Sequence, residues 1–358
     1  MFDITFASLT AFIITVLGIP SSIRVAEMKN LFDEPEARKS HSTSIPRLGG
    51  LSIFAGTLFS FAFWSAGYNY QSFPYLVAAL LIMFFIGLKD DIVTLTASKK
   101  FVGQLLASFV IVFFGQIRIT SLYGMFGVYD IPVYASIPFS IFTIIVITNA
   151  YNLIDGIDGL AAGIGAIASF TFGLWFYNYD QIPLCILSFG LFSSLLAFLI
   201  YNFEPARIFM GDTGSLIVGF ILSILAINFV ELSFNALPYS FPFRSSPAMA
   251  IAILIIPLTD TLRVFILRVI RKKSPFTADR NHLHHLLMDL GLSHRETSLI
   301  LFSVNFIFII LALSLRNISS LVLLILEVVL AIFFSAIPFY IKTLSHSAKD
   351  NPVDFKGL

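Results

Sequence analysis

Residues 182–202, IPLCILSFGLFSSLLAFLIYN, form a run of twenty-one residues without a charged side chain. A helix needs about 20 mostly apolar residues to cross a bilayer, so this run predicts a transmembrane helix. Ten further apolar runs lie along the chain, some of them shorter. The eleven predicted spans cover residues 4–23, 48–66, 74–88, 101–115, 136–149, 160–178, 182–202, 213–232, 247–267, 297–315 and 320–341.

The composition of the chain excludes most other classes of protein. Of its 358 residues 57% are hydrophobic and only 12% are charged, whereas a soluble domain carries roughly 25% charged residues. A soluble enzyme, a disordered chain and a disulfide scaffold are therefore excluded. The single cysteine, Cys185, allows neither an intrachain disulfide nor a cysteine metal cluster. We predict an all-α polytopic integral membrane protein with about eleven transmembrane helices.

The positive charges predict the orientation of the spans. With the N-terminus outside and eleven alternating spans, nineteen of the twenty-two Lys and Arg residues fall in inside segments; the exceptions are Arg118, Arg244 and Arg316. Since Lys and Arg concentrate in cytoplasmic loops, we expect a periplasmic N-terminus and a cytoplasmic C-terminus. The N-terminus has no basic segment, which favours a retained anchor. The outer loop 116–135 alternates and contains Tyr-Gly, so it predicts a small hairpin.

Two motifs place polar groups at cytoplasmic ends of predicted spans. GLKDDI puts Asp90 and Asp91 at the end of a helix, where acids are unfavourable unless a cation holds them; solvated end charges are the alternative. NAYNLIDGIDGLAAG, residues 149–163, contains two Asn and two Asp, each pair spaced by three and so on one helical face. These residues are Asn149, Asn152, Asp155 and Asp158. A simple turn between two spans is the alternative, and the amides that begin the next span could bind an anion.

Two further motifs lie in the remaining inside loops. NFEPARIFMGDTGSL, residues 202–216, places Asp212 just before a span, where it could also be a plain N-cap. ADRNHLHHLLMDLG, residues 278–291, gathers three histidines near an arginine: Arg280, His282, His284 and His285. Zinc would need further ligands in tetrahedral geometry, and only carboxylates are available. Carboxylates suit Mg²⁺ instead, so this basic, hydrogen-bond-rich cluster is interpreted as a phosphate-binding site.

Together these loops predict phosphoryl transfer at a membrane surface. The reaction needs a metal to neutralise charge, cations around the phosphate oxygens and an in-line nucleophile. A substrate inside the bilayer would explain why the enzyme is there too. A polytopic transporter of lipid-linked or phosphorylated sugars is the alternative, although we see no internal repeat of the kind that many transporters contain.

Five motifs in this order resemble those of the polyprenyl-phosphate N-acetylhexosamine-1-phosphate transferases, the glycosyltransferase 4 family. They are DEPEARKSHSTSIPRLGG, GLKDDI, NAYNLIDGIDGLAAG, IFMGDTGS and DRNHLHHLL. His-Leu-His-His and PLTDTLRVFILR at 257–268 resemble the bacterial undecaprenyl-phosphate GlcNAc-1-phosphate transferase branch. In the latter segment Asp260 and Arg263 could pair with each other or line the site.

The resemblance implies the reaction and its surroundings. The phosphate of undecaprenyl phosphate attacks the β-phosphorus of a UDP-N-acetylhexosamine, with UDP-GlcNAc favoured and other hexosamines open. Undecaprenyl-diphospho-sugar and UMP result, in the first membrane step of a cell-envelope glycan pathway such as cell-wall or O-antigen synthesis. The cofactor is Mg²⁺, with Mn²⁺ as an alternative. The partners are the two substrates and the bacterial inner membrane, without nucleic acid; a homodimer is left open.

The resemblance also implies roles for individual residues. Asp90 and Asp91 match an essential catalytic pair, and Asp90 is expected to activate or position the lipid phosphate. Asp212 and Asn152 match metal ligands. The nucleotide-binding positions are Asp158 and Phe209 at the uracil, with Asp155 and Asn149 in support. The phosphate- and sugar-binding positions are Lys100, Arg280, His282, His284 and His285. Residues 1–341 would form one transmembrane catalytic domain, and residues 342–358 a cytoplasmic tail.

Overall fold

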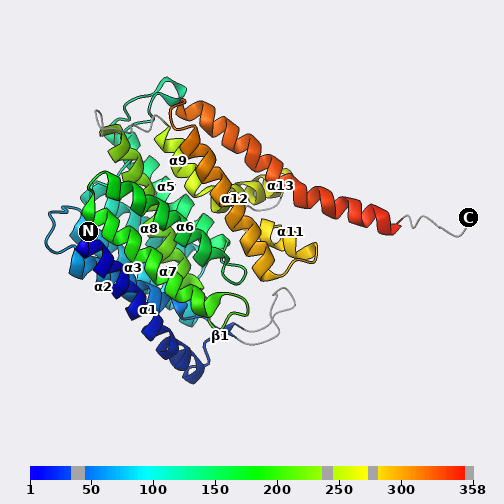
Figure 1. Cartoon of the computed structure of the whole chain (residues 1–358), viewed down its shortest axis with the longest axis horizontal. Helices are drawn as coiled ribbons and strands as arrows, with labels where there is room; N and C mark the ends of the chain where they lie inside the picture. Colours follow the sequence, from blue (N-terminus) through cyan, green and yellow to red (C-terminus); the bar gives the residue numbers. More distant parts are fainter. Residues whose placement is uncertain (34–44, 236–244, 273–280, 351–358) are drawn as a thin grey trace, which may run out of the picture.

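The computed structural model describes residues 1–33, 45–235, 245–272 and 281–350. Within them it is a bundle of helices with one two-stranded sheet (Figure 1). The helices are α1 (Phe2–Met28), α2 (Gly49–Trp64), α3 (Phe73–Val93), α4 (Ala97–Phe109), α5 (Val133–Leu153), α6 (Leu160–Asn178), α7 (Ile182–Asn202), α8 (Gly211–Asn235), α9 (Ser246–Ile253), α10 (Ile255–Ile270), α11 (Leu283–Asp289), α12 (His294–Ser314) and α13 (Ser320–Asp350). A π-helix, η1 (Val110–Phe114), continues α4, and a 3-10 helix, η2 (Met125–Gly127), lies in the following loop.

Each of the eleven predicted spans coincides with a helix or a pair of adjoining helices. Among the described residues, eight helices are long and apolar enough to cross a membrane, and the bent pair α9–α10 makes nine. α2 is apolar but has only 16 residues. The all-α polytopic class is thus confirmed, while the count of eleven spans and their orientation stay predictions. α13 continues as a helix to Asp350, beyond the predicted end of the last span at residue 341.

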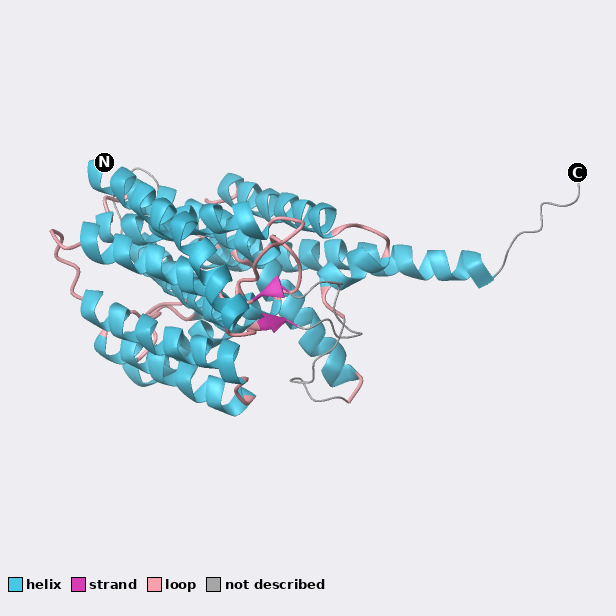
Figure 2. Ribbon diagram, turned by 90° about the horizontal axis from the view of Figure 1, so that it is seen from below, coloured by secondary structure: helices cyan, strands magenta, loops and turns pink. Residues whose placement is uncertain are grey.

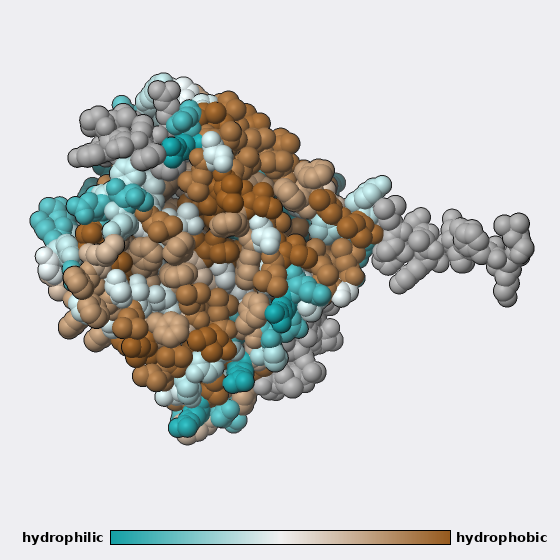
Figure 3. Space-filling model, in the orientation of Figure 1, coloured by the Kyte–Doolittle hydropathy of each residue, from teal (hydrophilic) through white to brown (hydrophobic). Residues whose placement is uncertain are grey.

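α8 is the central helix of the bundle. It contacts α2, α3, α5, α6, α7 and α9, and 83% of its apolar span is buried, compared with 22% for α13. The outer helices instead present apolar side chains to their surroundings, as on the face over α12 and α13 in Figure 3. These include Leu299, Phe306, Ile310, Ile325, Val329 and Phe333. An apolar exterior around a helical core is the arrangement that a lipid environment requires.

Small residues let α2 and α3 approach the start of α8 closely. A Cβ added at Gly50 would lie 2.1 Å from the Gly214 nitrogen, and one at Gly87 would lie 2.5 Å from the Thr213 Cα. Glycines at helix contacts allow this approach between membrane helices. The Gly50 N–H donates to the Met210 carbonyl at 2.8 Å. The C-terminal end of α3 and the N-terminal end of α8 are therefore held side by side.

The predicted span at 247–267 is formed by two helices, because the chain bends by 82° between α9 and α10. Pro257 has no N–H, so it cannot bond the carbonyl of Ile253 one turn earlier. The Asn305 side chain of α12 donates to that carbonyl instead, at 3.3 Å. The bend directs α10, with Asp260 buried on it, toward the loop that carries the histidines.

Two short β-structures mark the loops. Strands β1 (Phe32–Asp33) and β2 (Ile45–Pro46) pair antiparallel just before α2 (Figure 2). The hairpin predicted in the loop before α5 is confirmed by an antiparallel bridge between Ser121 and Asp130. β2 and the loop bridge lie near opposite ends of the bundle. β2 precedes the start of α2, where Gly50 bonds Met210 just before α8, whereas Thr120, next to Ser121, bonds Glu231 in the last turns of α8.

Candidate active site

The predicted motif residues meet at one end of the bundle. The C-terminal ends of α3 and α5, the first turn of α4 and the N-terminal end of α8 bring together Asp90, Asp91, Lys100, Asn152 and Asp212. These residues come from four different helices, and hydrogen bonds or ion pairs connect all of them. Of the expected site residues, Arg280 lies outside the described residues, as does most of the first-loop motif.

Lys100 lies between two carboxylates. Its ammonium contacts Asp90 Oδ2 and lies 3.1 Å from Asp212 Oδ2. Asp90 is buried, and its other carboxylate oxygen accepts from the Leu95 N–H just after α3. The cation that the acidic end of α3 needs is thus supplied by α4. Lys100 holds the two acids together, in addition to the diphosphate contact that the resemblance predicts for it.

Asp91 caps the N-terminus of α8 from a different helix. Its carboxylate accepts the Asp212 N–H at 2.8 Å and the Thr213 N–H at 3.0 Å, and also the Thr213 hydroxyl. The first N–H groups of a helix have no partner within the helix, and a carboxylate there also meets the positive end of the helix dipole. Asp91 therefore fixes the backbone from which Asp212 projects, so its geometry is that of a positioning residue.

We expect Asp91→Ala to lower both stability and turnover. Loss of an N-cap costs about 0.5–2 kcal/mol, and the freed start of α8 would misplace Asp212. The thermal unfolding midpoint in detergent should fall by several degrees and kcat should fall with it. Asp130→Ala, at an exposed position of the loop before α5, is the matched control. An unchanged unfolding midpoint for Asp91→Ala would contradict the capping role.

Asn152 and Asp212 form the core of the predicted metal site. The Asn152 amide donates to Asp212 Oδ1 and to Ser215 Oγ, both at 2.7 Å. No group of three His, Cys, Asp or Glu side chains among the described residues is arranged to hold a metal. Mg²⁺ needs no such group, because it commonly uses one or two carboxylates together with substrate phosphates and water. The predicted ligands, the Asp212 carboxylate and the Asn152 amide, offer hard oxygen donors of the kind that this cation takes.

Asn149 lies one turn away and is paired within the protein. Its amide exchanges hydrogen bonds with the Gln104 amide, at 2.6 and 3.2 Å, and also donates to the Ile145 carbonyl. Gln104 was not predicted from the sequence, although it follows Lys100 by four residues and so shares its helical face. Ser215 was not predicted either, although it follows Asp212 by three residues. The same spacing rule that selected the Asn and Asp pairs could have found both.

The loop between α5 and α6 carries two acids with different surroundings. Loss of solvent around Asp155, aided by the nearby negative charges of Asp212, Asp91 and Asp158, raises the pKa of its carboxyl to about 8. Asp158 is 4% exposed, accepts the Ala206 N–H at 3.0 Å, and lies 3.2 Å from His294 Nδ1.

Asp158 thus ties together the starts of α6 and α12 and the loop before α8. The Ser298 hydroxyl of α12 also donates to its carbonyl. Phe209 lies in the same loop, where its N–H donates to the Pro46 carbonyl at 2.7 Å and its ring is half-buried. His294 was not selected from the sequence, because its distance from the other histidines along the chain gave no motif.

The histidine segment packs over the loop between α5 and α6. His284 is 2% exposed, and a Cβ at Gly156 would lie 2.5 Å from its Nε2. Burial lowers the pKa of His284 to about 3, so it is neutral. His284 therefore adds no positive charge to the basic cluster that the sequence predicts. Its ring is tilted against that of His285, with centroids 4.3 Å apart.

Asp260 anchors the histidine segment to α10. Its carboxylate lies 2.8 Å from His282 Nδ1 and accepts the Leu283 N–H at 2.8 Å, which caps α11. Arg263 lies 3.5 Å from the same carboxylate and donates to the Asn281 carbonyl. Asp260 and Arg263 therefore pair with each other, as one of the two alternatives has it, and Asp260 also positions His282.

Comparison with known proteins shows the family to which this chain is similar. The sequence model of glycosyl transferase family 4 matches residues 73–230. A probable undecaprenyl-phosphate N-acetylglucosaminyl 1-phosphate transferase of Bacillus subtilis (strain 168) is 34% identical over 332 residues, which cover 91% of this chain and 90% of that protein. The undecaprenyl-phosphate alpha-N-acetylglucosaminyl 1-phosphate transferase of Escherichia coli (strain K12) is 29% identical, over 80% of this chain and 77% of its own.

A decaprenyl-phosphate N-acetylglucosaminephosphotransferase of Mycobacterium leprae (strain TN) is 33% identical over 84% of this chain and 80% of its own length. The likeness to these proteins extends far beyond the motifs. The family model itself spans the acids of α3, the polar end of α5 and the start of α8, where the connected residues lie. The chain therefore belongs to glycosyl transferase family 4, the polyprenyl-phosphate N-acetylglucosamine-1-phosphate transferases that its motifs resemble.

Proposed function

We propose that this protein transfers GlcNAc-1-phosphate from UDP-GlcNAc to undecaprenyl phosphate and releases UMP. The observation that carries the proposal is the meeting of Asp90, Lys100, Asn152 and Asp212 from four helices at one end of an apolar bundle. The relatives with matching length are named as transferases of this sugar phosphate to a polyprenyl phosphate. Family membership favours the enzyme over the transporter alternative.

The proposed location is the bacterial inner membrane, with the active site at the cytoplasmic surface. The apolar exterior supports a multi-pass protein, and the bias of Lys and Arg toward one side supports the orientation. A nucleotide sugar is soluble in water and a polyprenyl phosphate is soluble in lipid. Residues at helix ends, such as Asp90 and Asp212, lie where both substrates can arrive.

In the proposed mechanism, an oxygen of the lipid phosphate attacks the β-phosphorus of UDP-GlcNAc directly. The bond from that phosphorus to the bridging oxygen breaks, and UMP leaves with the bond electrons. A phosphate monoester has a second pKa of about 6, so the nucleophile is mostly ionised at pH 7 and needs positioning more than a strong base. Asp90 is assigned the positioning role, and Lys100 balances the charge of the diphosphate.

Asp212 and Asn152 would hold the Mg²⁺, with Mn²⁺ as an alternative cation. The metal would supply neutralisation of the diphosphate charge as the leaving group departs. The neutral His284, resting on Gly156, can hydrogen-bond the phosphates or the sugar without adding charge. His282 would be oriented for the same task by Asp260.

The proposal is tested with purified protein in detergent, undecaprenyl phosphate, Mg²⁺ and one UDP-sugar at a time. We expect UMP release with UDP-GlcNAc that depends on the lipid, stops with EDTA and returns with excess Mg²⁺. Release only with another UDP-hexosamine would correct the donor but keep the mechanism. No release with any donor from a folded, monodisperse sample would contradict the proposed function.

A further inference from the structure

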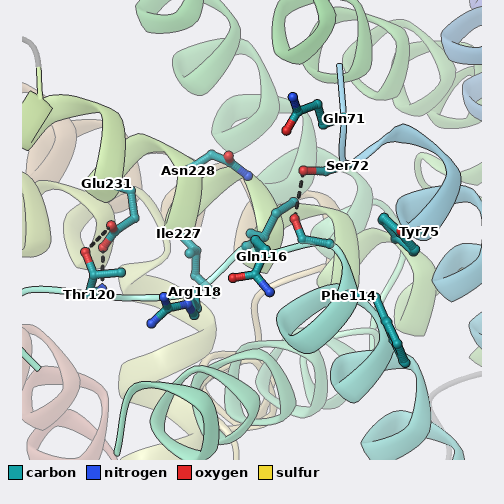
Figure 4. A pocket seen from close by; sticks show the side chains of 12 residues that line it. Gln71, Ser72, Tyr75, Phe114, Gln116, Arg118, Thr120, Ile227, Asn228 and Glu231 are labelled. Carbon is teal, nitrogen blue, oxygen red and sulfur yellow. Dashed lines mark hydrogen bonds between the residues drawn. The ribbon is translucent and has the colours of Figure 1, made fainter. Parts of the chain in front are cut away.

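A polar cavity lies at the end of the bundle opposite the active site. It has a volume of about 550 Å³, within the range of small-molecule sites. It is bounded by the start of α3, the end of η1 with the loop that follows, and the last turns of α8 (Figure 4). None of the residues that the sequence analysis selected for the reaction lines it.

The cavity wall carries one positive and one negative side chain. Glu231 of α8 accepts the Thr120 N–H at 2.7 Å and the Thr120 hydroxyl at 2.6 Å. Arg118 donates to the Ser136 hydroxyl at 3.2 Å. A guanidinium has five N–H donors, so Arg118 has donors beyond this bond. The rest of the polar wall is neutral, with the side chains of Gln71, Ser72, Gln116 and Asn228.

The other side of the cavity is apolar and faces outward. Tyr75 is 39% exposed and Phe114 is 50% exposed, and their rings stack with centroids 6.1 Å apart. In Figure 4 they lie across the cavity from Glu231 and Thr120. Since Tyr side chains are enriched at the boundary between lipid and water, and the exposed Phe114 ring beside Tyr75 is apolar, this side is placed to meet acyl chains.

The backbone between the two sides is irregular. Val110–Phe114 forms a π-helix, a feature often found at functional sites. Gln116, two residues later, has a φ of 56°, a conformation that non-glycine residues adopt at a cost. Together these features turn the Gln116 and Arg118 segment across the end of the bundle, where it closes one wall of the cavity.

We propose that this cavity binds the head group of a zwitterionic phospholipid, such as phosphatidylethanolamine. Arg118 would bind the phosphate, Glu231 the ammonium, and the Tyr75–Phe114 pair an acyl chain. A cavity with one charge of each sign favours a ligand with no net charge, and an apolar side favours one with a tail. The proposal rests on the position of the cavity in a membrane protein and is independent of the transfer reaction.

The test measures lipid retention by native mass spectrometry of the full-length protein from detergent. Phosphatidylethanolamine and phosphatidylglycerol with identical chains are supplied in equal amounts. We expect the wild type to retain the ethanolamine lipid preferentially, and Arg118→Gln to retain it about fivefold less, the factor for a contact worth about 1 kcal/mol. Arg271→Gln, at an exposed arginine away from the cavity, is the matched control and should behave as the wild type.

Removing the negative charge of the cavity makes the test specific for this site. Glu231→Gln leaves Arg118 as the only charge, so its preference should shift toward the anionic phosphatidylglycerol. Because Glu231 also holds Thr120 in place, Asn228→Ala serves as a second variant and should weaken retention of both lipids. UMP release should stay within about twofold of wild type in all three cavity variants, which confirms that they fold.

Three results would overturn the proposal. One is equal retention of the two lipids by the wild type, and another is an unchanged lipid preference in both charge variants. The third result concerns the lipid tail. If the tail contributes to binding, soluble phosphoethanolamine, which has none, should raise the unfolding temperature less than the lipid does. Equal stabilisation by the free head group would assign the cavity to a soluble zwitterion instead.

Discussion

Asp212→Asn is expected to reduce kcat by about 10³-fold while the protein remains folded in detergent. The substitution keeps the size of the side chain but removes the charge that Lys100 and Asn152 now contact. Loss of metal-based charge neutralisation is worth about 4 kcal/mol of transition-state stabilisation, which corresponds to that factor. UMP release at saturating UDP-GlcNAc and undecaprenyl phosphate measures it.

The matched control for this prediction is Asp289→Asn. Asp289 also pairs with a lysine, Lys342, at 2.7 Å, but both side chains are about one-third exposed. Exposed pairs contribute little, so activity and unfolding temperature should be unchanged. If Asp212→Asn kept more than about a tenth of wild-type turnover, the assignment of Asp212 as a metal ligand would have to be abandoned.

Gly87→Ala is expected to damage both the fold and the reaction. A Cβ at this position would lie 2.5 Å from the Thr213 Cα and 2.8 Å from its nitrogen, both backbone atoms that cannot rotate away. Overpacking of this kind costs about 1–3 kcal/mol. We expect α3 to move away from α8 to relieve the clash with the Thr213 backbone. This movement would pull Asp90 and Asp91 away from Asp212. A displacement of this size near the reacting groups can cost about 10²-fold in turnover.

The measurements for Gly87→Ala are the unfolding temperature and kcat. Gly67→Ala is the control, because a Cβ at Gly67 meets nothing within 4 Å. It tests the effect of the same methyl group in open space and should match the wild type in both measurements. A Gly87→Ala protein with normal kcat would show that the site does not depend on the close contact between α3 and α8.

The partners of Asp90 and Asp91 could not be predicted from the sequence. The motif predicts one essential pair, but the structure gives the neighbours separate partners. Asp90 faces Lys100, whereas Asp91 caps α8. Adjacent residues at the end of a helix point in different directions, and the partner of each is chosen by the helix that packs on that side. Those partners cannot be read from GLKDDI alone.

The histidine motif gives a similar lesson. Sequence reasoning found the three histidines and linked them to the phosphates, and the structure packs His284 against Gly156 in the loop between α5 and α6. It did not find that Asp260 orients His282 or that burial keeps His284 neutral. The bend between α9 and α10 decides the first point, and the depth of packing decides the second. Both depend on segments distant along the chain.

By itself the sequence determined the class of this protein, the position of its long apolar helices and most of the residues that gather at the site. In lipid a segment must satisfy its own backbone groups, so length and apolarity, which are local properties, suffice to predict its helix. The tertiary structure alone decided the roles of those residues. Asp91 and Asp212 are 121 positions apart, yet a hydrogen bond joins them, and the close contact between α3 and α8 that allows it belongs to the packing of the whole bundle.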